Sequence, residues 1–319
     1  MIGRRLVFVV QAAVTAALLI FLMSGFDWQA LRAIGERLSP SFYLMAFAVI
    51  VTGQLVYAWR WQMVLAAMGA AIRYGNVLKQ YLVGLFFSNL MPSAVGGDAV
   101  KVFYLGRDIG YTQAGASVMV DRFLGFFWLS VLGAALSWTS GASTPLLVLN
   151  RNLLTTTAGT FMLALVIVWL VPPDRIVPQP IRKRGYSLVA RLEALAGHVR
   201  AAGSHPATLL MSGVIVLSYI ALVAVAYRAF FTAAGIASPA ILSIMNVLVS
   251  TAVFVNVPIS VGGIGLREQL HYLLFAELGV VKEASVSISL VMYAFSLAVS
   301  LAGYVIWLRI KPSMPAVAA

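Results

Sequence analysis

Six ionisable residues lie within or beside long apolar stretches of this sequence. The set holds three acids and three bases: Asp98, Lys101, Asp121, Arg122, Arg267 and Glu268. An ionised side chain at the centre of a bilayer costs roughly 2.5 to 3.5 kcal/mol on insertion scales, so such residues are usually paired or functional. One hypothesis is a polar cleft at the membrane midplane that holds a zwitterionic or anionic head group, such as a lipid phosphate. The other is a set of structural ion pairs between parts of the fold.

The spacing of these residues predicts how they pair. Asp98 and Lys101 are three apart and therefore share one face of a helix. Asp121 and Arg122 are neighbours that point about 100° apart on a helix, so each is expected to find a partner elsewhere. Lys101 and Arg267 each follow a glycine pair, where the free amides of a half-helix would also favour an anion.

A seventh charged residue, Arg60, stands between Trp59 and Trp61. Tryptophan is enriched at membrane–water interfaces, and a long arginine side chain can reach from an apolar helix to the head groups. The sequence therefore favours an interfacial Arg60 over a buried functional one, although Arg60 remains a candidate for substrate binding.

Two matching motifs interrupt the apolar stretches, one in each half of the chain. Proline lacks an amide donor and glycine is unfavourable inside a helix, so each motif should break a helix. Broken helices at corresponding places in two halves are typical of a transporter's binding site. The expected helix-breaking residues are Asn89, Pro92, Gly96 and Gly97 in the first motif, and Asn256, Pro258, Gly262 and Gly263 in the second.

The composition excludes a soluble globular protein. Of the 319 residues, 61% are hydrophobic and 10% are charged, which indicates an integral membrane protein. The net charge of +12 is better explained by topology and anionic lipids than by nucleic acid. With no cysteine, thiolate chemistry is excluded. The three scattered histidines, His198, His205 and His271, are expected to be solvated or interfacial, and no metal, cofactor or ATP site is expected.

The hydropathy and charge pattern predicts an all-helical polytopic fold with two inverted repeats. Six full spans are expected, together with two re-entrant hairpins at about residues 79–107 and 239–278, or about eight hydrophobic segments. The repeat halves are about 1–171 and 207–311. Residues 174–206 carry six bases against two acids and form a basic amphipathic linker on the membrane surface. Hairpins that enter from opposite faces place this linker and both termini in the cytoplasm, as the positive-inside rule requires.

Several of these segments together resemble the lysylphosphatidylglycerol synthase transmembrane family, also called flippase-like domains. The resemblance covers nearly the whole chain and rests on four segments: 92–101 with its Gly-Gly-Asp, Asp121-Arg122, Arg60-Trp61, and 258–268 ending in Gly-Leu-Arg-Glu. It implies a bacterial inner-membrane domain that moves a lipid between leaflets. The lipid is an aminoacylated phospholipid in the best-known members, and members in hopanoid or glycolipid contexts also exist.

Two departures from the family pattern bear on the substrate. No soluble synthase domain is expected after the last helix, so aminoacyl transfer from tRNA is not expected. Asp121 stands where glutamate is more usual in the family, and the aspartate side chain has a shorter reach.

Two alternative functions stay open. One is a membrane-embedded lipid or sugar transferase that uses Asp98 or Glu268 as a base. The other is a membrane partner of a separately encoded synthase.

Overall fold

The chain is all helical in the part that the structure describes. A computed structural model describes residues 2–24, 26–90, 94–139, 144–170, 197, 200–201, 205–256 and 260–310, and no strand occurs among them. The predicted linker at 174–206 lies almost entirely outside these residues, as do Pro92 and Pro258.

Within the described ranges, seven helices precede the linker. Their bounds are α1 Ile2–Met23, α2 Trp28–Arg37, α3 Pro40–Ala67, α4 Tyr74–Leu90, α5 Ala94–Ile109, α6 Tyr111–Thr139 and α7 Pro145–Leu170. The short polar segment after the first apolar run is itself helical, because the Asp27 side chain accepts bonds from the Gln29 and Ala30 amides at 2.9 and 3.0 Å. Pro40, in the first turn of α3, fits a position where no amide donor is needed.

The second half repeats the pattern of long and short helices. Its elements are α11 Pro206–Ala233, α12 Ile241–Val255, the 3₁₀ turn η1 Val261–Gly263, α13 Leu266–Ala276 and α14 Lys282–Arg309. Helices α12 and α13 lie within the segment 239–278 that was predicted from the sequence, since its apolar run and its glycines set the boundaries.

Four helices within the described ranges are long and apolar enough to cross a membrane: α3, α6, α11 and α14. A fifth span is possible if residues 9–23 of α1 and the bent continuation in α2 count as one. These helices confirm the all-helical membrane fold. They do not reproduce the expected six full spans, and the inverted repeat with re-entrant hairpins remains a proposal.

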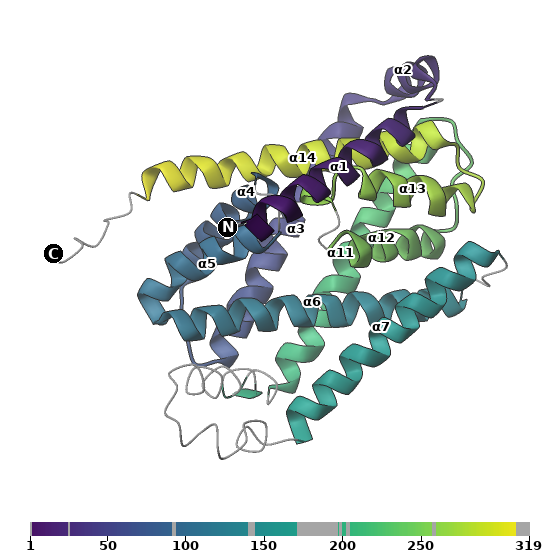
Figure 1. Ribbon diagram of the computed structural model, residues 1–319. Helices are drawn as coiled ribbons and strands as arrows, with labels where there is room; N and C mark the ends of the chain where they lie inside the picture. Colours follow the sequence, from purple (N-terminus) through teal and green to yellow (C-terminus); the bar gives the residue numbers. More distant parts are fainter. Residues whose placement is uncertain are drawn as a thin grey trace.

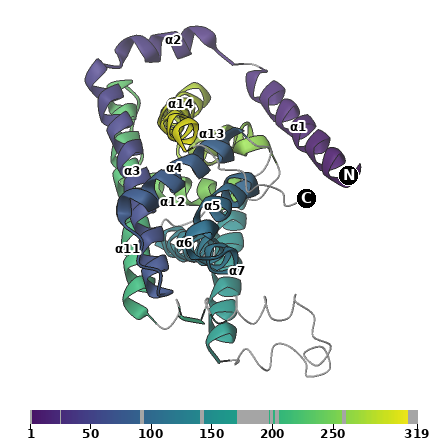
Figure 2. The same cartoon turned by 90° about the vertical axis from the view of Figure 1, so that its left-hand side faces the viewer.

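The long helices surround a shared core and turn apolar side chains outward. Helices α3 and α11 run side by side, and α6 and α14 cross them (Figures 1 and 2). The core includes Phe42 of α3 and Phe230 of α11, whose rings lie 5.7 Å apart. Leu44 is 71% exposed and Leu210 is 61% exposed. Large apolar side chains in this position suit contact with lipid tails rather than water.

Candidate functional site

The first motif is an antiparallel hairpin of α4 and α5. Gly97 lies against the Gly84 carbonyl and the Ser88 side chain, while Gly84 lies against the Lys101 side chain. The order of these contacts shows that the two helices run in opposite directions. A Cβ at Gly97 would overlap the α4 backbone, so glycine lets the helices approach closely enough to place Asp98 and Lys101 beside α6.

The second motif turns the chain between α12 and α13. Gly262, Gly263 and Gly265 adopt φ values of 60°, 77° and 79°, a region that favours glycine. The Glu268 carboxylate then accepts a bond from the Gly265 amide at 2.8 Å and another from the Ser289 hydroxyl at 3.2 Å. Glu268 is only 1% exposed and therefore serves as a buried cap at the start of α13.

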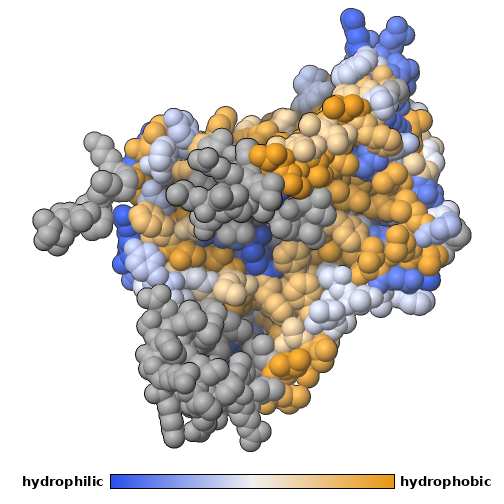
Figure 3. All heavy atoms as spheres, in the orientation of Figure 1, coloured by the Kyte–Doolittle hydropathy of each residue, from blue (hydrophilic) through white to orange (hydrophobic). Residues whose placement is uncertain are grey.

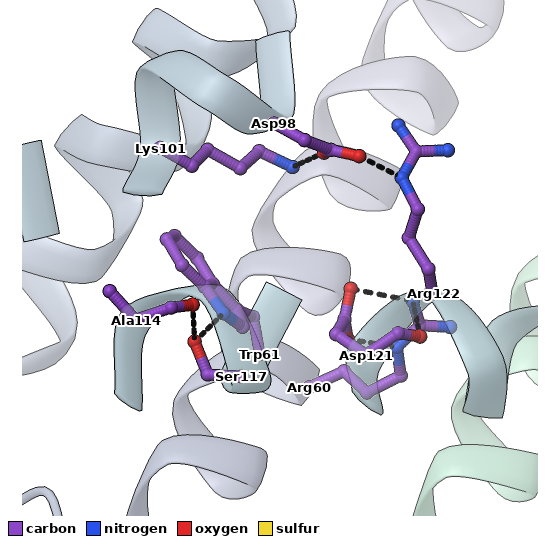
Figure 4. Close-up of polar contacts among 8 residues, drawn as sticks. All are labelled: Arg60, Trp61, Asp98, Lys101, Ala114, Ser117, Asp121 and Arg122. Atoms are coloured by element: carbon purple, nitrogen blue, oxygen red, sulfur yellow. Dashed lines mark hydrogen bonds and ion pairs between the residues drawn. The ribbon is translucent and has the colours of Figure 1, made fainter. Parts of the chain in front are cut away.

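Two separate ion pairs connect α6 to its neighbours, as Figure 4 shows. Asp98 on α5 accepts a hydrogen bond from Arg122, and its other oxygen lies 3.7 Å from the Lys101 ammonium. Asp121 pairs instead with Arg60 on α3, at 2.8 and 3.0 Å. The predictions that Asp98 and Lys101 share a helix face, and that Asp121 and Arg122 have different partners, are confirmed.

The prediction that Arg60 reaches the membrane interface is wrong. Arg60 is 8% exposed, and its guanidinium lies against Gly125 of α6, where the absence of a side chain leaves room. Trp61 is also buried, and its indole donates to Ser117 at 3.2 Å. Only Trp59 of this tripeptide is exposed. Arg60 and Trp61 therefore pack against α6 instead of marking a head-group boundary.

Residues from both halves of the chain line a cavity of about 510 Å³. Its charged lining consists of Arg60, Lys101, Asp121, Arg122 and Arg267, and both helix breaks reach it through Asn89, Asn256, Ser260, Gly262 and Gly263. In Figure 3 hydrophilic surface lies in the central hollow and hydrophobic surface surrounds it. Charged groups carried on long apolar helices need partners, and the pairs of Arg60 with Asp121 and of Arg122 with Asp98 supply them.

Aromatic rings support the cations that line the cavity. The Arg60 guanidinium lies 5.0 Å from the Tyr57 ring, the Lys101 ammonium 4.5 Å from the Tyr81 ring, and the Arg267 guanidinium 4.4 Å from the Tyr293 ring. Within the described ranges, no acidic side chain forms an ion pair with Arg267. Its guanidinium can therefore bind an anion without first breaking an existing pair.

The structure brings most of the predicted site residues together, but not all. Asp98 lies behind the cavity wall and holds Lys101 and Arg122, whereas Glu268 is a cap outside the lining. Gly96 lies in the first turns of α5 and is not in the lining. Among the residues that the structure describes, no cluster of three or more His, Asp or Glu side chains could hold a metal ion.

Among the lining residues that sequence reasoning missed, Tyr227 and His271 form a buried pair. His271 is 2% exposed and lies 2.9 Å from the Tyr227 hydroxyl, so the prediction of a solvated or interfacial histidine is wrong for His271. Both residues line the cavity. They belong to different helices and are 44 residues apart, and no motif connects them.

Crossed apolar helices around a half-open cavity with a charged lining define a polytopic membrane protein with a polar site between its helices. The chain belongs to the family described as the lysylphosphatidylglycerol synthase TM region, whose model matches residues 8–303. This match confirms the family expected from the motifs.

Relatives of the chain are UPF0104 membrane proteins of archaea. The chain is 24% identical to one from Methanothermobacter thermautotrophicus over 301 residues, which cover 85% of this chain and 84% of the relative. It is 29% identical to one from Methanocaldococcus jannaschii over 103 residues, or 30% and 31% of the two chains. It is 30% identical to one from Pyrococcus horikoshii over 92 residues, or 28% of each chain. The last two matches thus span about a third or less of those relatives. No solved structure matches the chain.

Proposed function

We propose that this protein moves a polar lipid between the two leaflets of a membrane and holds the phosphate of its head group in the charged cavity. The observation that carries the proposal is the convergence of both broken segments and four basic side chains on one cavity between apolar helices long enough to span a membrane. Discontinuous helices around a polar site are the usual arrangement in membrane transporters.

The charge balance of the site favours an anionic head group. Four bases line the cavity, and the carboxylates that pair with them are Asp98 and Asp121, so two positive charges are left over. Even if the buried Glu268 is counted, one positive charge remains. A phosphate diester carries one negative charge and matches this excess, and the planar guanidinium of Arg267 suits two of its oxygens.

The ion pair between Arg122 and Asp98 supports a gating role for these residues. It ties the first hairpin to α6, and the Arg122 side chain is 34% exposed. A bound phosphate competes with Asp98 for Arg122 and so loosens this tie. The head group then occupies the cavity while the acyl chains stay in the bilayer, next to the exposed apolar side chains of the long helices.

The proposal includes the finer architecture and setting. The antiparallel packing of α4 on α5 supports a re-entrant first hairpin, and the contacts of α12 with α13 support a second one. Charge bias supports cytoplasmic termini, and the family resemblance supports a bacterial inner membrane. The candidate lipid is an anionic or aminoacylated phospholipid, because a hopanoid or a glycolipid without a phosphate would not use this site. A separate synthase subunit is a candidate partner.

A leaflet-specific quenching assay tests the function. Purified protein is reconstituted into vesicles that contain head-group-labelled phosphatidylglycerol or, in parallel, labelled phosphatidylcholine, and an impermeant reductant bleaches the outer leaflet. We expect the bleached fraction to exceed that of protein-free vesicles, and the excess to be larger for phosphatidylglycerol. Bleaching equal to that of protein-free vesicles for both lipids contradicts the proposal.

A further inference from the structure

His271 is held in a single neutral tautomer by two hydrogen bonds. Its Nδ1 lies 2.9 Å from the backbone carbonyl of Arg267, which can only accept, so Nδ1 carries the hydrogen. Its Nε2 lies 2.9 Å from the Tyr227 hydroxyl. In the neutral ring Nε2 has no hydrogen, and Tyr227 must donate to it. The tyrosine hydrogen therefore points at the histidine and not into the cavity.

A second proton on this ring has one place to bind, which is Nε2. The Nε2–H group then donates to the tyrosine oxygen, and the Tyr227 hydroxyl turns its own hydrogen away from His271. Because Tyr227 and His271 both line the cavity, one proton adds a positive charge to the wall and makes a new hydrogen-bond donor available to a ligand. Both changes favour a bound anion.

The neighbours of His271 keep the empty site neutral. The ring is 2% exposed, and the Phe275 ring lies 5.8 Å away, centroid to centroid. Arg267, on the same helix, opposes a second positive charge. Glu268 is committed to the Gly265 amide and to Ser289.

The other elements that pack near His271 contribute few titratable groups. On α14, Tyr293 lies beneath Arg267, while Lys282 and Glu283 bond to the Ser24 carbonyl and the Asp27 amide. On α11, Tyr227 bonds to the ring. Helix α12 and residues 9–23 of α1 carry no ionisable side chain. An anion at Arg267 therefore removes the main charge that opposes protonation.

We propose that His271 is a proton-binding site coupled to the cavity. An anionic head group at Arg267 draws one proton onto Nε2, and the Tyr227 hydroxyl then donates to the head group. The inference rests on the proposed function for the identity of the anion. It goes further by naming a proton as the ion that binds together with the lipid. Histidine suits this role because its charge changes between about pH 5 and 8.

Proton uptake on lipid binding tests the coupling directly. Short-chain phosphatidylglycerol is titrated into the full-length protein in weakly buffered detergent at about pH 6, with a pH indicator to count protons. The diester phosphate of this lipid does not titrate in that range. The wild type should take up as much as about one proton per lipid, and its affinity should rise as much as about tenfold for each unit of decrease in pH.

Substitutions separate His271 from other proton acceptors. His271→Asn keeps a donor for the Arg267 carbonyl but has no Nε2, so it should bind the lipid with no uptake and with an affinity independent of pH. His205→Asn changes an exposed histidine at the start of α11 and should behave as the wild type. Tyr227→Phe keeps its ring on Phe275 and should show a smaller rise in affinity at low pH, because the hydroxyl donor is gone.

The outcomes distinguish the proton coupling from the proposed lipid transport. If the wild type binds the lipid without proton uptake, the coupling is wrong and the proposed function stands. Uptake by His271→Asn equal to that of the wild type also overturns the coupling. If the wild type does not bind the lipid, the proposed function fails and the coupling fails with it. If His271→Asn does not fold, the coupling is still tested by proton uptake in the wild type and by the affinity of Tyr227→Phe at low pH. A rise in affinity at low pH as large in Tyr227→Phe as in the wild type contradicts the role of the hydroxyl.

Discussion

Arg60 of α3 and Asp121 of α6 form an ion pair inside the protein, with the Arg60 Nε 2.8 Å from the Asp121 carboxylate. Their side chains are 9% and 11% exposed, and Arg60 also donates to the Asp121 backbone carbonyl at 3.3 Å. The pair connects two of the four helices that, in the part of the chain that the structure describes, are long and apolar enough to span a membrane. Because both side chains are largely shielded from solvent, each charge depends on the other.

Asp121→Asn should therefore destabilise the protein. Removing one partner of a buried ion pair leaves the other charge uncompensated and costs about 3 to 5 kcal/mol. We expect a clear drop in the thermal unfolding midpoint of the purified protein in detergent. The matched control is Glu36→Gln, which breaks the exposed pair of Arg32 and Glu36, 83% and 65% exposed, and should cost about 0.5 kcal/mol or less. Equal midpoints for the two variants would contradict the interpretation of the buried pair.

Because α4 and α5 pack closely at Gly97, we expect Gly97→Ala to lower both the stability of the protein and lipid transport. The new methyl group would overlap the Gly84 carbonyl and the Ser88 side chain, and overpacking of this kind costs about 1 to 3 kcal/mol. The displaced α5 should also reduce lipid transport. Gly115→Ala on α6 meets no atom within 4 Å and should be neutral or stabilising by as much as about 1 kcal/mol. Wild-type stability and transport in Gly97→Ala would show that the close approach of the two helices is not required.

Sequence reasoning predicted the parts of the site that depend on local spacing. Asp98 and Lys101 face the same way because they are three apart. The two helix-breaking motifs also meet at one cavity, the first through Asn89 and the second through Asn256, Gly262 and Gly263. The helices were also predictable, since long apolar runs end at glycine or proline.

The remaining features depend on contacts between distant segments. A tryptophan beside an arginine looks the same in sequence whether it contacts head groups or another helix. Asp121 is 61 residues from Arg60, so local spacing could not predict that they pair. The same holds for Tyr227 and His271, on α11 and α13. The short helix α2 was missed because it has no long apolar run; the cap at Asp27 and the burial of Ile34 on one face stabilise it.

Tyr293→Leu should weaken the binding of an anionic lipid without unfolding the protein. The Tyr293 ring lies 4.4 Å from the Arg267 guanidinium and orients it, and a cation–π contact contributes about 0.5 to 2 kcal/mol. We expect an affinity loss of roughly 2- to 30-fold for short-chain phosphatidylglycerol, measured by calorimetry. Tyr272→Leu removes a ring that faces Lys282 at 5.4 Å, outside the cavity, and should leave the affinity unchanged. A similar loss in both variants would mean that the effect is not specific to Arg267.

We expect Glu268 to contribute mainly to the stability of the fold. Glu268→Ala removes the acceptor for the Gly265 amide and the Ser289 hydroxyl, so it should lower the free energy of unfolding by about 1 to 3 kcal/mol. Glu268→Gln keeps an oxygen for one of these donors and should cost less. Thermal unfolding of the two variants in detergent provides the comparison. A smaller loss in Glu268→Ala than in Glu268→Gln would contradict the capping role.

The central claim is that lipid passes through the cavity with its phosphate at Arg267. The most direct measurement is the rate of phosphatidylglycerol movement between leaflets in vesicles that contain Arg267→Gln. Arg228→Gln is the matched control, because Arg228 is exposed on α11 and outside the cavity lining. Loss of a charged hydrogen bond costs about 1.5 to 3 kcal/mol, so Arg267→Gln should be slower by roughly tenfold or more, while Arg228→Gln keeps the wild-type rate. A folded Arg267→Gln that moves the lipid at the wild-type rate would contradict the claim.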